Sequence, residues 1–121
     1  MPSVIKNNFG AAYPKSTDVE WERDGELYQV EFETAEGVDH EIWYDAYVNI
    51  RREEVDISTA ELPAAVRRTV AADFAGYTID DAKRVVTPEG ESYQMDLEAL
   101  LKEDWVVTFT ADGRLLSKVE D

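Results

Sequence analysis

The chain has no cysteine, a single histidine and no apolar run that approaches the length of a membrane span. Without cysteine it has no disulfide, no thiolate metal site and no cysteine nucleophile. A membrane helix needs about 20 consecutive apolar residues, so we expect no membrane insertion. The first residues lack the charged-then-apolar pattern of a signal peptide. The protein is therefore either cytoplasmic, or exported by a signal that this sequence does not include.

Positive charge is scarce as well. The 121 residues include 12 basic and 27 acidic side chains, for a formal net charge of −15. A field of this sign repels nucleic-acid phosphates and anionic membranes, so binding to either is disfavoured. It also opposes self-association and favours a monomer, although solubility alone could account for it. The length and the 44% apolar content suit one domain with a real core.

The sequence contains few of the residues that a catalytic mechanism would need. His40 is the only histidine, and a catalytic triad would require it as the base, next to a serine and an orienting carboxylate. The serines fall at predicted caps, turns or strand ends: Ser3, Ser16, Ser58, Ser92 and Ser117. Acidic pairs are frequent, but none is marked by an apolar pocket, and no EF-hand pattern occurs. The sequence predicts no enzyme, no cofactor and no dedicated metal site.

The chain matches itself when it is shifted by about 65 residues. Residues 28–33 then fall on residues 93–98, and each position keeps its chemical character. Further matches in the same register are Phe9 with Phe74, Ile42 with Val107, Tyr44 with Phe109, and Ile50 with Leu115. Several matches in one register indicate an internal duplication. We therefore predict one domain of two repeats, residues 1–57 and 58–121.

Each repeat begins with a predicted helix. In the second repeat apolar residues recur every four positions, at Leu62, Val66, Val70 and Phe74. Pro63 suits the first helical turn, Gly76 a helix stop, and Ser58 or Thr59 an N-cap. In the first repeat the apolar positions are Val4, Ile5, Phe9 and Ala12, before Tyr13 and Pro14 end the helix. This first helix is expected to be about one turn shorter than the second, as if residues upstream were missing.

Segments that alternate between polar and apolar residues follow each helix, which is typical of half-buried antiparallel strands. Predicted strands cover residues 19–23, 27–34, 39–46 and 49–57, then 82–87, 92–97, 104–110 and 114–120. Turn residues such as Asp24-Gly25 separate them. Residues 98–102 are ambiguous, because their composition favours a helix and their place in the repeat favours a strand end or loop. The fold class is thus α+β, with two tandem repeats of a helix and a four-stranded antiparallel meander.

Several of these segments together resemble the PepSY-like, β-lactamase-inhibitory-protein-like family. They are Leu62-Pro63, Phe74-Ala75-Gly76-Tyr77, Tyr93-Gln94-Met95-Asp96-Leu97 and Phe109-Thr110-Ala111-Asp112-Gly113. The first repeat matches less well, since Asp45-Ala46-Tyr47-Val48 lacks the Asp-Gly turn of the second. The resemblance implies one curved, eight-stranded sheet with the helices on one side. It also implies export to the periplasm or outside the cell, as in mostly secreted Bacteroidetes members, but a fold does not fix a function.

The alternation assigns the strand residues to two sheet faces. The apolar face, expected beneath the helices, holds Val19, Trp21, Tyr28, Val30, Phe32, Ile42, Tyr44, Tyr93, Met95, Leu97, Val107 and Phe109. The polar face holds Glu20, Glu22, Gln29, Glu31, Glu33, Glu41, Asp45, Gln94, Asp96, Glu98, Thr108 and Thr110. Trp43 lies among these polar residues, and Tyr47 lies in the turn that follows. An aromatic side chain on a polar face either anchors a partner, covers an end of the sheet or packs on the neighbouring repeat.

These patterns favour a binding or inhibitor-like module of the cell envelope. In this hypothesis the acidic sheet face binds a protein or peptide with basic residues, which the acids attract and Trp43 anchors. The candidate partner-binding residues are Trp43, Glu31, Glu33, Glu41, Asp45, Tyr47, Glu20 and Glu22. The alternative is an envelope protein whose face binds a cation or a small polar ligand. Self-association of the duplicated face is the third hypothesis.

Overall fold

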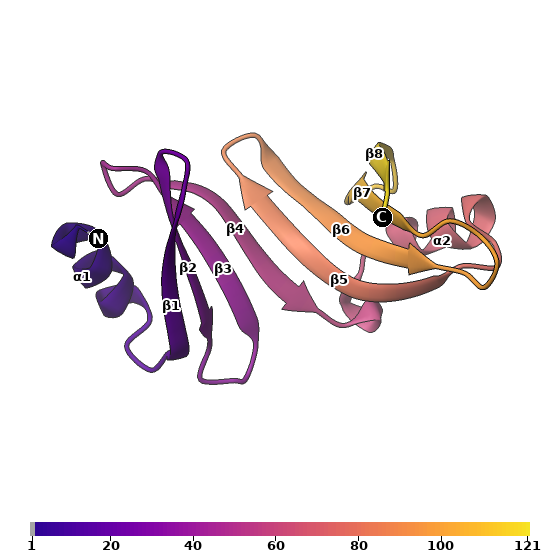
Figure 1. Ribbon diagram of the computed structural model, residues 1–121. Helices are drawn as coiled ribbons and strands as arrows, with labels where there is room; N and C mark the ends of the chain where they lie inside the picture. Colours follow the sequence, from indigo (N-terminus) through magenta and orange to yellow (C-terminus); the bar gives the residue numbers. More distant parts are fainter. Residues whose placement is uncertain (1) are drawn as a thin grey trace. The chain divides into compact units, whose positions relative to one another are not determined.

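A computed structural model describes residues 2–121, in which the chain forms two α-helices and eight strands (Figure 1). The first helix and meander are α1 (Ser3–Ala12), β1 (Thr17–Asp24), β2 (Leu27–Glu33), β3 (Asp39–Tyr44) and β4 (Ile50–Ile57). A 3₁₀ turn, η1 (Thr59–Glu61), precedes α2 (Ala64–Asp73), β5 (Thr78–Thr87), β6 (Gly90–Glu98), β7 (Trp105–Thr110) and β8 (Leu115–Glu120). The strand order in the sheet is β1 to β8, without a crossover. The predicted α+β fold with an eight-stranded antiparallel meander is confirmed.

The chain divides into two compact units. The first unit extends to Val55 and also includes Val86–Glu89, at the turn between β5 and β6. The second unit comprises Asp56–Val85 and Gly90–Asp121. Each unit has its own apolar cluster.

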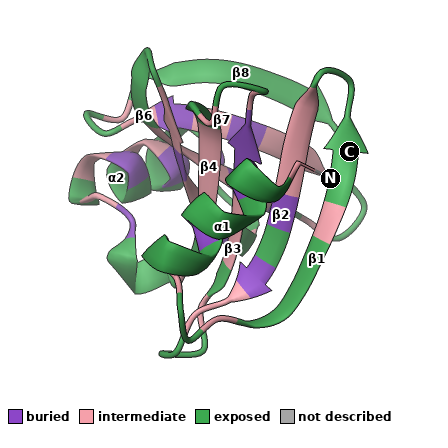
Figure 2. Cartoon of the chain, turned by 90° about the vertical axis from the view of Figure 1, so that its left-hand side faces the viewer, coloured by how far each residue is buried: buried purple, intermediate pink, exposed green. Residues whose placement is uncertain are grey.

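In the first unit α1 packs across one face of β1, β2 and β3, as Figures 1 and 2 both show. Ile5 and Phe9 are the buried residues of α1. They join the buried strand residues Val30, Phe32, Ile42 and Tyr44. The apolar face predicted from the alternation is therefore the core face, except that Val19 is exposed.

In the second unit α2 contributes Val66 and Val70 to a cluster that also contains Leu62, Phe74, Ala82, Met95, Leu97, Val107 and Phe109. The turn between β7 and β8 is attached to this helix by one side chain. The Thr69 hydroxyl lies 3.1 Å from the Ala65 carbonyl oxygen and 2.8 Å from that of Gly113. Gly113 adopts a φ of +88° in this turn.

The two helices have the same length, ten residues each, so the prediction of a shorter first helix is wrong. The backbone hydrogen bonds at the C-terminal ends of the two helices show which residues of the two repeats are equivalent. The Tyr13 N–H donates to the Phe9 carbonyl oxygen, and the Phe74 N–H donates to that of Val70, both at 2.9 Å. Phe9 therefore matches Val70 rather than Phe74, and Tyr13 matches Phe74.

The physical reason for this mismatch is the length of one hairpin. Strands β5 and β6 have 10 and 9 residues, whereas β1 and β2 have 8 and 7. Each longer strand adds two residues to the spacing between equivalent positions. The shift of about 65 residues that superposes the later strands of the two repeats is thus four residues too large to superpose their helices.

The start of α2 also differs from the prediction in detail. Ser58, rather than Thr59, forms the cap: its N–H and its hydroxyl both lie 3.0 Å from Glu61 Oε1. The hydrogen bond from the Ser58 N–H is the main cause of a lowered pKa of Glu61. This cap serves the 3₁₀ turn η1, and α2 begins after Pro63, which is its N-cap residue. The ambiguous residues 98–102 form the end of β6 and part of the following loop.

Candidate functional site

The face of the first unit opposite α1 carries a row of glutamates in direct cross-strand register. Glu20 pairs with Glu31, Glu31 with Glu41, and Glu41 with Glu54. Neighbouring strands are about 4.8 Å apart, so these carboxylates start from closely spaced backbone positions. Like charges directly opposite each other destabilise a sheet. Within the row, the Gln29 side-chain amide donates to Glu41 at 2.6 Å, and Arg52 Nε donates to Glu54 at 2.7 Å.

The neighbouring row runs from Glu22 through Gln29 and Trp43 to Arg52. Trp43 is on the polar face, as predicted, but it is only 9% exposed and does not protrude as the expected anchor would. Its indole N–H donates to Asp24 Oδ2 at 2.9 Å. The guanidinium carbon of Arg52 lies 5.8 Å from the centre of its ring. Both side chains contact the indole, and the alternation pattern could not predict its burial.

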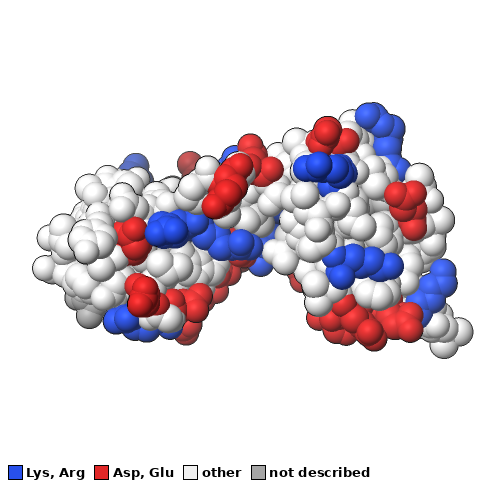
Figure 3. All heavy atoms as spheres, turned by 90° about the horizontal axis from the view of Figure 1, so that it is seen from above, with Lys and Arg blue, Asp and Glu red and all other residues white. Residues whose placement is uncertain are grey.

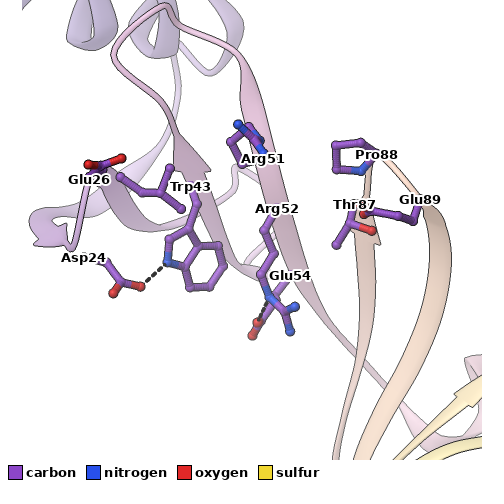
Figure 4. Close-up of a pocket in the computed structure, with 10 residues that line it drawn as sticks. Asp24, Glu26, Trp43, Arg51, Arg52, Glu54, Thr87, Pro88 and Glu89 are labelled. Carbon is purple, nitrogen blue, oxygen red and sulfur yellow. Dashed lines mark hydrogen bonds and ion pairs between the residues drawn. The ribbon is translucent and has the colours of Figure 1, made fainter.

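Trp43 belongs to the wall of an open hollow of about 810 Å³. In Figure 4 its indole lies between Asp24 and Arg52, and Thr87, Pro88 and Glu89 lie across from Arg51 and Arg52. The hollow belongs entirely to the first unit, because Val86–Glu89 are part of that unit. It is lined by Asp24, Glu26, Leu27, Trp43, Arg51, Arg52, Glu54, Thr87, Pro88 and Glu89.

Two of the candidate residues, Asp45 and Tyr47, lie in the turn between β3 and β4. Asp45 was expected on the strand face, but its carboxylate accepts hydrogen bonds from the N–H groups of Tyr47 and Asn49, at 2.9 and 3.0 Å. These bonds, chiefly the one from the Asn49 N–H, lower the pKa of Asp45. Tyr47 is 86% exposed, in agreement with its prediction as an exposed aromatic residue. Asp45 therefore has a role in the turn, and binding by Tyr47 stays a prediction.

We expect Asp45→Ala to lower the melting temperature at pH 7, and the difference from the wild-type protein to shrink as the pH falls from 6 to 3. Because the pKa of Asp45 is lower in the folded state, its contribution is present above its unfolded pKa and is lost as the pH falls through the folded pKa. Thermal unfolding across this pH range measures the effect. In the second unit Thr110 takes the same place, and its hydroxyl accepts from the Arg114 N–H at 3.1 Å. Asp45→Thr is thus the matched control, and an Asp45→Ala difference that persists unchanged at pH 3 would contradict the prediction.

The remaining acidic candidates lie in different places on the first unit. Glu20, Glu31 and Glu41 share the glutamate row, and Glu22 lies in the Trp43 row. Glu33 is farther along, opposite Asp39 and Thr17. The hollow brings in Asp24, Arg52 and Glu54, which were not among the candidates. Extending the two-residue alternation into β4 would have placed Arg52 and Glu54 on the same face, but nothing in the sequence indicated Pro88 or Glu89.

The second unit also has acidic groups that repel one another. The pKa of Glu98 is raised, first by the charge of Asp80. The pKa of Asp96 is raised, first by burial and then by the charges of Asp121 and Asp81. Figure 3 shows that basic side chains interrupt the acidic ones on the face in view. The raised pKa values of Glu98 and Asp96 therefore mark local groups of acidic side chains in the second unit.

His40 lies on the core side of the first unit, among aromatic rings. It stacks on Phe32 with ring centres 5.2 Å apart, and its Nε2 is 3.4 Å from a Glu53 carboxylate oxygen. Burial, and then the Glu53 charge, raise the pKa of the nearby Tyr13. Burial, and then the charges of Tyr13 and Glu53, raise the pKa of Tyr44 to about 12. These surroundings fit a structural role for His40.

Within residues 2–121, no three histidine or acidic side chains are grouped so that they could hold a metal ion. Neither helix of this described part is long and apolar enough to cross a membrane.

Solved structures show the same fold at low sequence identity. A DUF2874 family protein from Bacteroides uniformis is 21% identical, with a TM-score of 0.88 over 99% of this chain and 89% of that one. A BLIP-like protein from Bacteroides fragilis is 22% identical, with a TM-score of 0.81 over 98% and 85%. A structure from Bacteroides eggerthii, described among "putative periplasmic proteins", is 21% identical, with a TM-score of 0.89 over 98% and 88%.

No curated protein matches the sequence. A family model described as "Putative beta-lactamase-inhibitor-like, PepSY-like" matches residues 1–52 and again residues 35–117. The two matches support the predicted duplication, and an inhibitor-like family fits a non-enzymatic binding module. The chain belongs to the PepSY-like, β-lactamase-inhibitor-like family.

Proposed function

We propose that this protein is a non-enzymatic binding module of the cell envelope, and that the first unit binds a protein or peptide with a basic surface. The observation that supports this most directly is the Trp43 hollow, which lies beside the glutamate row on the face opposite α1. A concave site with an aromatic wall and convergent polar groups is a usual form of binding site. The periplasmic description of a structural neighbour supports the envelope location.

The glutamate row favours a basic partner on energetic grounds. Glu20, Glu31 and Glu41 lie in register on three neighbouring strands, an arrangement of like charges that generally disfavours a sheet. Lysine or arginine residues of a partner would remove the repulsion as they bind. The net charge of −15 would also speed the encounter with such a partner at low salt.

The test is binding to lysozyme, a small basic protein used here as a probe. Changing Glu20, Glu31 and Glu41 together to glutamine should weaken binding about tenfold, from three surface charge pairs at up to about 0.5 kcal/mol each. Binding of the wild-type protein should also weaken as the salt concentration rises. Isothermal titration calorimetry at two salt concentrations measures both effects.

The matched control removes the same number of charges elsewhere. Glu36, Asp73 and Glu103 are exposed and lie outside the row, so Glu36→Gln, Asp73→Asn and Glu103→Gln form the control variant. We expect this control variant to bind lysozyme more tightly than the variant in which Glu20, Glu31 and Glu41 are changed to glutamine. Equal affinities for the two variants would show that only total charge matters, and would remove the role of this face.

A further inference from the structure

The Trp43 ring in the hollow already has a cation beside it. The Arg52 guanidinium carbon is 5.8 Å from the ring centre, and Arg52 Nε donates to Glu54 Oε2 at 2.7 Å. An aromatic face together with a carboxylate is a favourable site for a guanidinium group. Arg52 is thus bound by its own chain as an arginine from another molecule would be bound.

The two groups that hold Arg52 are more fixed than Arg52 itself. The Glu54 side chain is 12% exposed, whereas the Arg52 side chain is 40% exposed. Trp43 is held from its other side by the hydrogen bond to Asp24. Of these three side chains, Arg52 therefore has the most direct access to solvent.

The charges around the hollow determine which occupant fits. Its lining includes four carboxylates and two guanidinium groups. Arg51 lies 3.7 Å from the Asp45 carboxylate, and Glu26 and Glu89 are exposed. If Arg52 turned outward, the hollow would keep all four carboxylates and lose one positive charge. A basic side chain complements this arrangement, and an acidic one does not.

We propose that the Trp43 hollow binds an arginine side chain of the partner, which takes the place that Arg52 occupies in the free protein. This rests on the proposed function and adds the chemistry of the partner to it. Arginine is favoured over lysine, because a planar guanidinium stacks on the indole and forms two parallel hydrogen bonds with one carboxylate. Arg52 is then an internal competitor that keeps the site closed until such a partner arrives.

The test uses a tetra-arginine peptide as the probe. Arg52→Gln should bind it about fivefold more tightly than a control that loses the same charge elsewhere, the factor expected when one cation–π contact no longer competes. Arg68→Gln is that control, because Arg68 is exposed on α2 in the second unit. Glu54→Gln should weaken binding. Calorimetry gives the affinities, and the NMR signal of the Trp43 indole N–H reports whether the peptide reaches the hollow.

The outcomes separate this proposal from the proposed function. Three results would each overturn the arginine site: equal affinities of Arg52→Gln and Arg68→Gln for the peptide, weaker binding by Arg52→Gln, or an unmoved Trp43 signal. This holds even if changing Glu20, Glu31 and Glu41 to glutamine abolishes binding to lysozyme. If Arg52→Gln raised the affinity for a tetra-lysine peptide by as much as it raises the affinity for tetra-arginine, the preference for arginine would be overturned. A moved Trp43 signal with the expected gain would support the site, even if lysozyme does not distinguish the row variant from its control.

Discussion

Gly113→Ala is expected to destabilise the second unit by about 3 kcal/mol, the sum of a left-handed backbone penalty and a steric clash. The φ of +88° at this position is one that an L-residue rarely adopts. A Cβ atom there would lie 2.7 Å from the Ala65 carbonyl oxygen and 2.8 Å from the Thr69 hydroxyl. Since the first of these atoms belongs to the backbone of α2, the clash cannot be relieved by turning a side chain.

The same change would also disturb the contact between the turn and the helix. The Thr69 hydroxyl reaches the Gly113 carbonyl oxygen at 2.8 Å, and a displaced turn would lose this bond. Urea unfolding followed by circular dichroism measures the change in the free energy of unfolding.

Gly25→Ala is the matched control for the clash. Gly25 has a φ of +61°, but a Cβ atom there has no neighbour within 4 Å. We expect it to cost only about 1 kcal/mol, the left-handed penalty alone. If the two variants lost equal stability, the close approach of α2 to the turn would not matter, and the prediction would fail.

The first repeat lacks glycine at the equivalent turn, yet it folds into the same turn. Val48 takes the place of Gly113 with a φ of +65°, and its N–H donates to the Asp45 carbonyl oxygen at 3.1 Å. The Gly113 N–H donates to Thr110 in the same way, at 3.0 Å. A β-branched residue is rarely found in this conformation, so turn propensity could not have predicted it. The packing of Val48 against the first core cluster accompanies this strained backbone.

The strands and the core face could be predicted because alternation reports burial directly. Val30, Phe32 and Ile42 are buried as their positions require, and Glu31 between them is exposed. The helix register could not be predicted, because two longer strands change the spacing between repeats and leave no local signal. The hollow could not be predicted either: Pro88 is 45 positions beyond Trp43 in the sequence, and only the tertiary fold brings them to one site.

Phe9→Ala is expected to destabilise the first unit by about 3–5 kcal/mol, the usual cost of removing a buried phenylalanine ring. Phe9 is 4% exposed and contacts three other rings: Trp21 at 5.5 Å and Phe32 at 4.8 Å edge to face, and Tyr13 at 5.6 Å stacked. Each such pair adds to the loss beyond the buried area. Urea unfolding followed by tryptophan fluorescence measures the effect.

The loss of stability in Phe9→Ala should affect α1 before the rest of the first unit. This helix has only Ile5 and Phe9 buried, no side-chain cap and no acidic residue in its first turn. A ten-residue helix without tertiary packing is marginal in water. In Phe9→Ala the amide protons of α1 should therefore exchange much faster than those of β2 and β3, whereas in the wild-type protein we expect both regions to be protected.

Two further variants isolate the packing term from a general weakening of the helix. Phe9→Leu keeps most of the apolar volume and should cost less than half as much as Phe9→Ala. Val4→Ala changes a side chain of the same helix that is 58% exposed, and should change stability by no more than about 0.5 kcal/mol. If Val4→Ala accelerated exchange in α1 as strongly as Phe9→Ala, helix propensity rather than the aromatic contacts would hold α1 in place. Faster exchange in Phe9→Ala alone would instead identify the ring cluster of Phe9, Trp21 and Phe32 as the anchor of α1.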